Sequence, residues 1–202
     1  MVEMISDVFK PAVTRVITPT AKAMLKVGLT PNGVTALGGV GVIASSLIFY
    51  PSSHFFLGTV LICVFALSDL FDGTMARISN RGSSPWGSFL DSTMDRITDS
   101  SILIGLLLAL NKISDPLVPV ILVALVTGML VPYIRAKAES LNIECSGGIA
   151  ERTERLMLAL FAIGFHGLGI PFVLSIGIWV LTLLSFTTVI QRALIVRRAL
   201  DK

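Results

Sequence analysis

Six long apolar runs, separated by short polar segments, constrain the fold of this chain more than any other feature. They cover about 33–50, 55–77, 88–111, 116–138, 153–165 and 172–194. Hydrophobic residues make up 53% of the chain and charged residues only 14%, a balance typical of integral membrane proteins. Because a spanning segment has to satisfy its own backbone polar groups, each run predicts a transmembrane helix. We therefore expect an all-α integral membrane protein with six transmembrane helices.

The first 28 residues follow a different pattern. Their apolar residues recur at helical spacing, with lysine and arginine nearby. This pattern predicts an amphipathic helix in the membrane interface, bent around Pro11 and Pro19; a partly disordered basic tail is the alternative. Residues 29–198 then form the six-helix bundle. Because no internal repeat or low-complexity linker divides the chain, 1–202 is expected to be a single membrane domain.

The basic residues predict the orientation of the helices. Fifteen of the sixteen lie in the N-terminal segment, in 77–96, in 135–155 or at the C-terminal end, and the alternate loops contain only Lys112. The positive-inside rule therefore places both termini on the cytoplasmic side of a multi-pass cell membrane protein. The net charge of +3 reflects this orientation, and we expect membrane lipids rather than nucleic acid as partners.

Four aspartates interrupt this apolar sequence, and they predict a metal site. Asp69 and Asp72 share one helix face, and Asp91 and Asp95 form a stripe on the next helix. Charges near a membrane interior are costly, and four carboxylates repel one another unless a cation lies between them. Oxygen ligands in this number favour Mg²⁺, Mn²⁺ or Ca²⁺. They are also enough for two metal ions, an arrangement suited to displacement at phosphorus.

The residues around the aspartates predict a diphosphate-binding site. Gly73, Ala76 and Gly87 are small and leave room for a nucleotide. Arg77 offers a fork of donors to a phosphate, and Ser83 lies in a short loop rich in donors.

The spacing D-x2-D-G-x2-A-R-x9-G-x3-D-x3-D resembles the signature of the CDP-alcohol phosphotransferase family. Its eight positions are Asp69, Asp72, Gly73, Ala76, Arg77, Gly87, Asp91 and Asp95. The resemblance implies six transmembrane helices, a homodimer and a dinuclear site facing the cytoplasm, with two Mg²⁺ per active site and Mn²⁺ as the alternative. Family members transfer a substituted phosphate from a CDP-linked donor to an alcohol and release CMP. By resemblance, Asp69, Asp72 and Asp91 bind metal, while Asp95 both contacts metal and acts as the general base.

The segment LTPNGVT also resembles the family. Thr30 and Pro31 read equally well as a helix cap and first helical residue, so Asn32 is either a diphosphate contact or part of a helix start. Asp99 continues the acidic stripe outside the signature, and we expect it either to support the site or to pair with Arg96.

Five basic residues at predicted cytoplasmic helix ends are candidates to bind the phosphate of a phosphorylated acceptor. They are Arg135, Lys137, Arg152, Arg155 and Arg192. Between 135 and 155, however, four glutamates balance the four cations, which is equally typical of solvated helix ends.

The phrases PYIRAKAES and GGIAERTERL resemble actinobacterial phosphatidylinositol phosphate synthases, although relatives often have proline in place of Thr153. This resemblance implies an enzyme of phospholipid biosynthesis that transfers the phosphatidyl group of CDP-diacylglycerol to inositol 1-phosphate. A phosphatidylglycerol-phosphate synthase that uses glycerol 3-phosphate is the alternative within the family. From other classes, a prenyltransferase would lack the D-G-x2-A-R core, and a cation-coupled transporter would show paired repeats and broken midplane helices.

Overall fold

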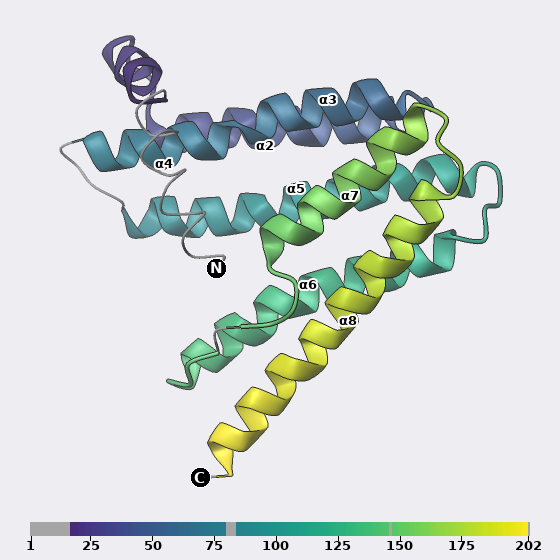
Figure 1. The fold of residues 1–202 in the computed structure, drawn as a ribbon. Helices are drawn as coiled ribbons and strands as arrows, with labels where there is room; N and C mark the ends of the chain where they lie inside the picture. Colours follow the sequence, from purple (N-terminus) through teal and green to yellow (C-terminus); the bar gives the residue numbers. More distant parts are fainter. Residues whose placement is uncertain (1–16, 80–83, 146, 202) are drawn as a thin grey trace, which may run out of the picture. The chain divides into compact units, whose positions relative to one another are not determined.

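The computed structural model describes residues 17–79, 84–145 and 147–201, and all regular structure within them is helical. A helix over 17–26 precedes the labelled elements (Figure 1). These are α2 (Pro31–Phe49), α3 (Phe55–Ala66), α4 (Ser68–Ile78), α5 (Pro85–Asn111), α6 (Val118–Ser140), α7 (Arg152–Gly167) and α8 (Val173–Leu200). Each predicted apolar run is helical, and the second run is divided at Leu67 into α3 and α4.

Among the described residues, four helices are long and apolar enough to cross a membrane: Pro31–Phe49, Phe55–Ile78, Val118–Ser140 and Val173–Leu200. Of the six spans expected from the sequence, four therefore have the length and composition of a membrane-crossing helix. The other two, α5 and α7, do not, and each for its own reason. Helix α5 carries Asp91, Asp95, Arg96 and Asp99 in its first half, and α7 has only 16 residues.

The chain divides into two compact units that alternate along the sequence. The first contains Met1–Ala44 and Leu61–Thr98, and the second contains Ser45–Val60 and Asp99–Lys202. The four aspartates of the signature belong to the first unit, and the five candidate acceptor cations belong to the second.

The core of the first unit lies where the helix over 17–26 meets α2 and α4. Ala21, Val34 and Met75 are buried there, and Ile17 and Phe71 pack against them. On the other face of the same helix, Lys22 and Lys26 are exposed. Residues 1–16 of the predicted interfacial helix lie outside the described residues, so its position in the membrane interface stays a prediction.

Two capped helix starts position the polar end of the first unit. The backbone N–H of Gly33 donates to Thr30 Oγ1 at 3.1 Å, which confirms Thr30 as the cap that precedes Pro31. The N–H of Gly87 donates in the same way to Ser84 Oγ at 3.0 Å at the start of α5. A capped start fixes the first turn of its helix, and each of these first turns carries a predicted donor-binding residue.

In the second unit, α8 packs against both α6 and α7 (Figure 1). Ile121, Ile163 and Ile178, one from each helix, are completely buried. Helix α7 begins with a capping box, in which Glu151 accepts from the N–H of Glu154 and Glu154 accepts from the N–H of Glu151. This box fixes the first turn of α7, where two of the candidate acceptor cations lie.

Candidate active site

Among the carboxylates of the signature, that of Asp72 on α4 has the best-defined surroundings. Asp72 is only 8% exposed, and the Thr35 hydroxyl on α2 donates a hydrogen bond to Asp72 Oδ2. The same hydroxyl lies 3.2 Å from the carbonyl oxygen of Pro31. A buried carboxylate is costly unless it is hydrogen-bonded, so this contact both stabilises Asp72 and limits its orientation.

Two other carboxylates of the signature lie near Asp72. The negative charges of Asp69, on the same helix, and of Asp91, on α5, both act on the Asp72 side chain. Asp69 and Asp91 are exposed, whereas Asp72 is buried. The structure therefore brings acids from α4 and α5 into electrostatic range of one another, as their spacing predicted.

Asp95 is partly buried one turn after Asp91 on α5. Arg96 Nη2 lies 3.6 Å from Asp95 Oδ2, an ion pair of neighbouring residues. The carbonyl oxygen of Asp95 accepts from Thr98 Oγ1 at 3.2 Å. Within the part of the chain that the structure describes, no three histidine, cysteine, aspartate or glutamate side chains are grouped closely enough to hold a metal ion. The metal-binding role of the four aspartates therefore stays a prediction.

The residues predicted to bind the CDP donor differ in how closely they are packed. A Cβ atom added to Gly87 would lie 3.0 Å from Asn32 Oδ1, so α2 and α5 approach closely at this point. Arg77 is exposed, and its Nη2 donates to Thr74 Oγ1 at 3.2 Å. Gly73 is exposed and a Cβ atom there would meet nothing within 4 Å, which fits a position that borders open space.

Ala76, the remaining donor candidate of α4, is partly buried. Ser83 lies outside the described residues.

Two of the five acceptor cations are buried in the second unit. Arg155 is 9% exposed, and its Nη1 donates to the carbonyl oxygen of Ala150 at 2.9 Å. Arg192 is 5% exposed, and it donates from Nε to Gly147 O at 3.0 Å and from Nη1 to Val131 O at 2.7 Å. Arginine is almost never fully buried unless it is paired, and here both guanidinium groups donate to main-chain carbonyl groups. Of the five candidate cations, these two are the ones that are buried and held in a fixed orientation.

The loop before α7 is attached along α8 by several contacts. The N–H groups of Ile149 and Ala150 donate to Gln191 Oε1 at 3.2 Å and to Thr188 Oγ1 at 3.4 Å. Gly148 has φ +134°, and a Cβ atom there would lie 2.5 Å from Thr188 Cγ2. Together with the Arg192 contact to Gly147, these bonds hold the loop that leads into Arg152 and Arg155.

Arg152, at the start of α7, is partly buried and pairs with Asp99 of α5. Asp99, which was expected either to support the site or to pair with Arg96, meets Arg152, and Arg96 meets Asp95.

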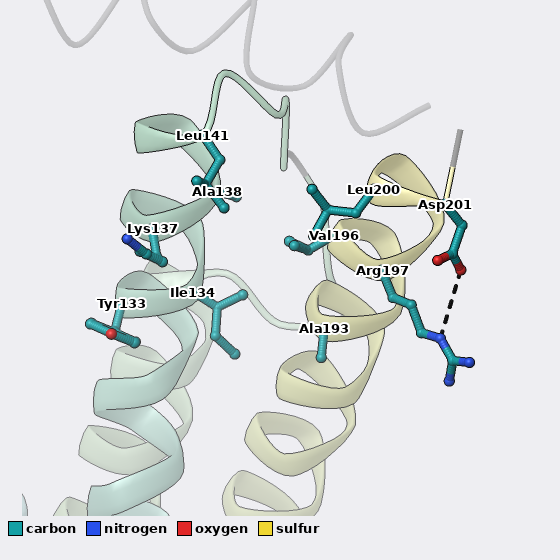
Figure 2. Close-up of a pocket in the computed structure, with 10 residues that line it drawn as sticks. All are labelled: Tyr133, Ile134, Lys137, Ala138, Leu141, Ala193, Val196, Arg197, Leu200 and Asp201. Atoms are coloured by element: carbon teal, nitrogen blue, oxygen red, sulfur yellow. Dashed lines mark ion pairs between the residues drawn. The ribbon is translucent and has the colours of Figure 1, made fainter.

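The last two candidate cations, Arg135 and Lys137, are exposed on α6. Arg135 pairs with Glu139 at 2.9 Å, one turn further on. Lys137 lines a groove of about 400 Å³ between the C-terminal ends of α6 and α8, with the Arg197–Asp201 ion pair at its α8 side (Figure 2). Ile134, Ala193 and Val196 make much of this groove apolar. Arg135 and Lys137 are thus less constrained than the two buried arginines.

Sequence reasoning missed the residues that support the site. Thr35 lies three positions after Asn32 and therefore on the same face of α2, which is the signal that could have identified it. Thr188 and Gln191 lie four and one positions before Arg192, but they are ordinary polar residues near the end of an apolar run.

Comparisons with known proteins agree with these features. A family model described as CDP-alcohol phosphatidyltransferase matches residues 28–194. The chain is 43% identical over 194 residues to a phosphatidylinositol phosphate synthase of Streptomyces avermitilis, a match that covers 92% of this chain and 79% of the relative. It is 39% identical over 203 residues to the synthase of Cutibacterium acnes, covering 96% and 98% of the two chains.

Solved structures are similar as well. The crystal structure of Mycobacterium tuberculosis phosphatidylinositol phosphate synthase with CDP-DAG bound matches with a TM-score of 0.86 and 38% identity, over 90% of this chain and 94% of that one. The structure of the same enzyme in complex with manganese and citrate matches with a TM-score of 0.85 and 38% identity, over 89% and 88% of the two chains.

Proposed function

Because the chain belongs to the CDP-alcohol phosphatidyltransferase family and is an enzyme of that family, we propose that it is a phosphatidylinositol phosphate synthase. It transfers the phosphatidyl group of CDP-diacylglycerol to a hydroxyl of inositol 1-phosphate and releases CMP. The names of its relatives and the CDP-DAG in a similar crystal structure support this choice of substrates. Among the structural observations, the burial of Arg155 and Arg192 gives the strongest support to the proposal, because cations held in fixed positions can bind the phosphate group of a phosphorylated acceptor.

In the proposed reaction, the acceptor hydroxyl attacks the phosphorus atom next to the lipid. The new O–P bond forms as the bond to CMP breaks, and CMP leaves with the bonding electrons. Asp95 takes the hydroxyl proton, since an alcohol is a poor nucleophile near neutral pH without a base. Asn32, Gly73, Ala76, Arg77, Ser83 and Gly87 are proposed to hold the CDP donor. A carboxylate base fits because Asp95 is only partly buried and lies one helical turn after Asp91 on α5.

Asp69, Asp72, Asp91 and Asp95 are proposed to hold divalent metal, with two Mg²⁺ ions per active site and Mn²⁺ as the alternative. The residues fit such ions on their own chemistry: all are carboxylates, and the charges of Asp69 and Asp91 act on Asp72. The manganese complex of a similar structure supports a divalent ion. When bound, the ions would neutralise the diphosphate and the charge on the leaving CMP. The Thr35 hydroxyl orients Asp72 for this role.

Arg155 and Arg192 are proposed to bind the acceptor phosphate, with Arg135, Lys137 and Arg152 as further cations of the same site. Main-chain carbonyl groups already orient both buried guanidinium groups, so little conformational entropy remains to be lost when the phosphate binds. We further propose that all six apolar runs cross the cell membrane, with the active site and both termini in the cytoplasm, and that the enzyme is a homodimer. The distribution of basic residues supports the orientation.

The test is CMP release by the purified protein with CDP-diacylglycerol and Mg²⁺. Inositol 1-phosphate, free inositol and glycerol 3-phosphate are compared as acceptors, and Asp95→Asn serves as the inactive control. We expect turnover with inositol 1-phosphate and a loss of at least about a hundredfold in Asp95→Asn. Turnover with glycerol 3-phosphate instead would reject the proposed acceptor and leave the family reaction intact. Absence of CMP with every acceptor would contradict the reaction itself.

A further inference from the structure

Arg96 on α5 has fewer polar contacts than its burial calls for. Its Nε atom is buried and has no hydrogen-bond partner among the described residues. Its Nη2 atom lies 3.6 Å from Asp95 Oδ2, which is too long for a hydrogen bond. A guanidinium group carries five N–H donors, and a buried donor without a partner costs free energy. The described part of the chain therefore leaves this cation largely unsatisfied.

The pair with Asp95 does not satisfy Arg96, because the two residues are neighbours on one helix. Neighbouring side chains of a helix point about 100° apart. Their contact is accordingly long, whereas Arg135 and Glu139, which are four residues apart, meet at 2.9 Å. The Arg96 and Asp95 side chains are only 28% and 16% exposed, so water satisfies them incompletely. A cation kept in such surroundings is best explained by an anion that it binds.

The position of Arg96 indicates which anion this is. Arg96 belongs to the same compact unit as the four aspartates of the signature and the residues proposed to hold the CDP donor. Its one ion pair is with Asp95, which is proposed to take the proton of the attacking hydroxyl. Because that hydroxyl attacks the phosphorus atom next to the lipid, a group in contact with Asp95 lies nearer to this phosphate than to the phosphate of the leaving CMP.

We propose that Arg96 binds the lipid-proximal phosphate of CDP-diacylglycerol, with Nε and an Nη group donating to its non-bridging oxygens. This inference rests on the proposed function and deepens it, because it adds to the donor site a residue outside the eight-position signature. A guanidinium fork matches two oxygens of one phosphate. No bond to Arg96 forms or breaks in the reaction. Its positive charge stabilises the charge on these oxygens while the acceptor hydroxyl attacks.

The test measures the binding of two soluble nucleotides, CDP and CMP, by calorimetry in the presence of Mg²⁺. CDP carries both phosphates of the donor head group, whereas CMP carries only the phosphate that leaves. For Arg96→Gln we expect the Kd for CDP to rise about tenfold or more, as for a lost hydrogen bond to a charged group, and the Kd for CMP to stay within about twofold. Arg96→Lys keeps the positive charge and should recover part of the affinity for CDP.

A second background separates direct binding from an effect through Asp95. In Asp95→Asn the charged partner of Arg96 is already removed, so the further change Arg96→Gln should still weaken CDP binding about tenfold. Arg197→Gln is the matched control, since it removes a guanidinium group from the exposed pair with Asp201 and should leave both Kd values unchanged. Thermal unfolding in detergent shows whether each variant is folded.

Three results would overturn the role of Arg96: an unchanged Kd for CDP in Arg96→Gln, an equal rise for CDP and CMP, or a loss that disappears in the Asp95→Asn background. If the parent protein binds neither nucleotide, the proposed donor is wrong and the role of Arg96 fails with it. If the parent binds CDP but turns over glycerol 3-phosphate instead of inositol 1-phosphate, only the proposed acceptor fails, and a selective loss of CDP affinity still supports the role of Arg96.

Discussion

Thr35 on α2 donates a hydrogen bond to Oδ2 of Asp72 on α4, 37 residues later in the chain. Both residues are buried, at 8% exposure each, so water competes little for this contact. Carboxylates that bind metal ions usually also accept a hydrogen bond from a neighbouring side chain, which fixes their orientation. Thr35 therefore connects the capped start of α2 with the acidic face of α4.

We predict that Thr35→Val, which keeps the side-chain shape and removes the hydroxyl, lowers the affinity of the enzyme for its metal ions. The Mg²⁺ concentration for half-maximal CMP release should rise by about 10- to 100-fold, the range found when partners of metal ligands are removed. Thr187→Val is the control, because the exposed Thr187 hydroxyl donates to Leu183 O of its own helix at 2.8 Å and to no carboxylate among the described residues. Equal Mg²⁺ dependence in the two variants would rule out this role for Thr35.

A second prediction concerns metal binding itself and has a readout independent of turnover. Adding Mn²⁺ to metal-free protein should raise the thermal unfolding midpoint, since a ligand that binds only the folded state stabilises it. The increase should be lost in Asp72→Asn and Asp91→Asn. In the same preparations, chelation by EDTA should abolish CMP release, and excess Mg²⁺ should restore it. An unfolding midpoint that does not respond to Mn²⁺ or Mg²⁺ would argue against a metal site formed by these aspartates.

Local features of the sequence predicted local features of the structure. Thr30 as a helix cap before Pro31 was predictable because capping depends on residues a few positions apart. The helical nature of all six apolar runs followed from hydropathy in the same way. The number of spans did not follow from hydropathy. Helices α5 and α7 both form, but α5 carries charges in its first half and α7 is short, so neither has the length and apolarity of a typical span.

Contacts between distant segments were not predictable from one sequence. The Asp99–Arg152 pair joins residues 53 positions apart, and no spacing rule relates them. The same holds for burial among the acceptor cations. The sequence presents five similar basic residues, but of these five only Arg155 and Arg192 are buried, and their guanidinium groups donate to main-chain carbonyl groups. Such differences depend on helix packing, which hydrophobic periodicity does not specify.

Gly73 and Gly128 form a natural pair for testing the donor site. Both are helical, and a Cβ atom at either position would meet nothing within 4 Å. Replacement by alanine should therefore leave the fold intact, or stabilise it slightly through a better helix propensity. If Gly73 borders the space for the CDP group, only Gly73→Ala should raise the KM for CDP-diacylglycerol, by about fivefold or more. A similar KM in both variants would remove Gly73 from the donor site.

Gly148 tests whether the loop before α7 positions the acceptor cations. Alanine is strained at φ +134°, and its Cβ atom would lie 2.5 Å from Thr188 Cγ2, so the loop has to move away from α8. We predict a loss of about 1–3 kcal/mol in the free energy of unfolding and a rise of about tenfold in the KM for inositol 1-phosphate. Gly169→Ala is the control, since Gly169 has φ +83° but meets nothing within 4 Å. It should be destabilised by backbone strain alone, without a change in KM. Equal KM values in the two variants, measured alongside their unfolding midpoints, would show that the attachment of the loop to α8 stabilises the fold without positioning Arg152 and Arg155.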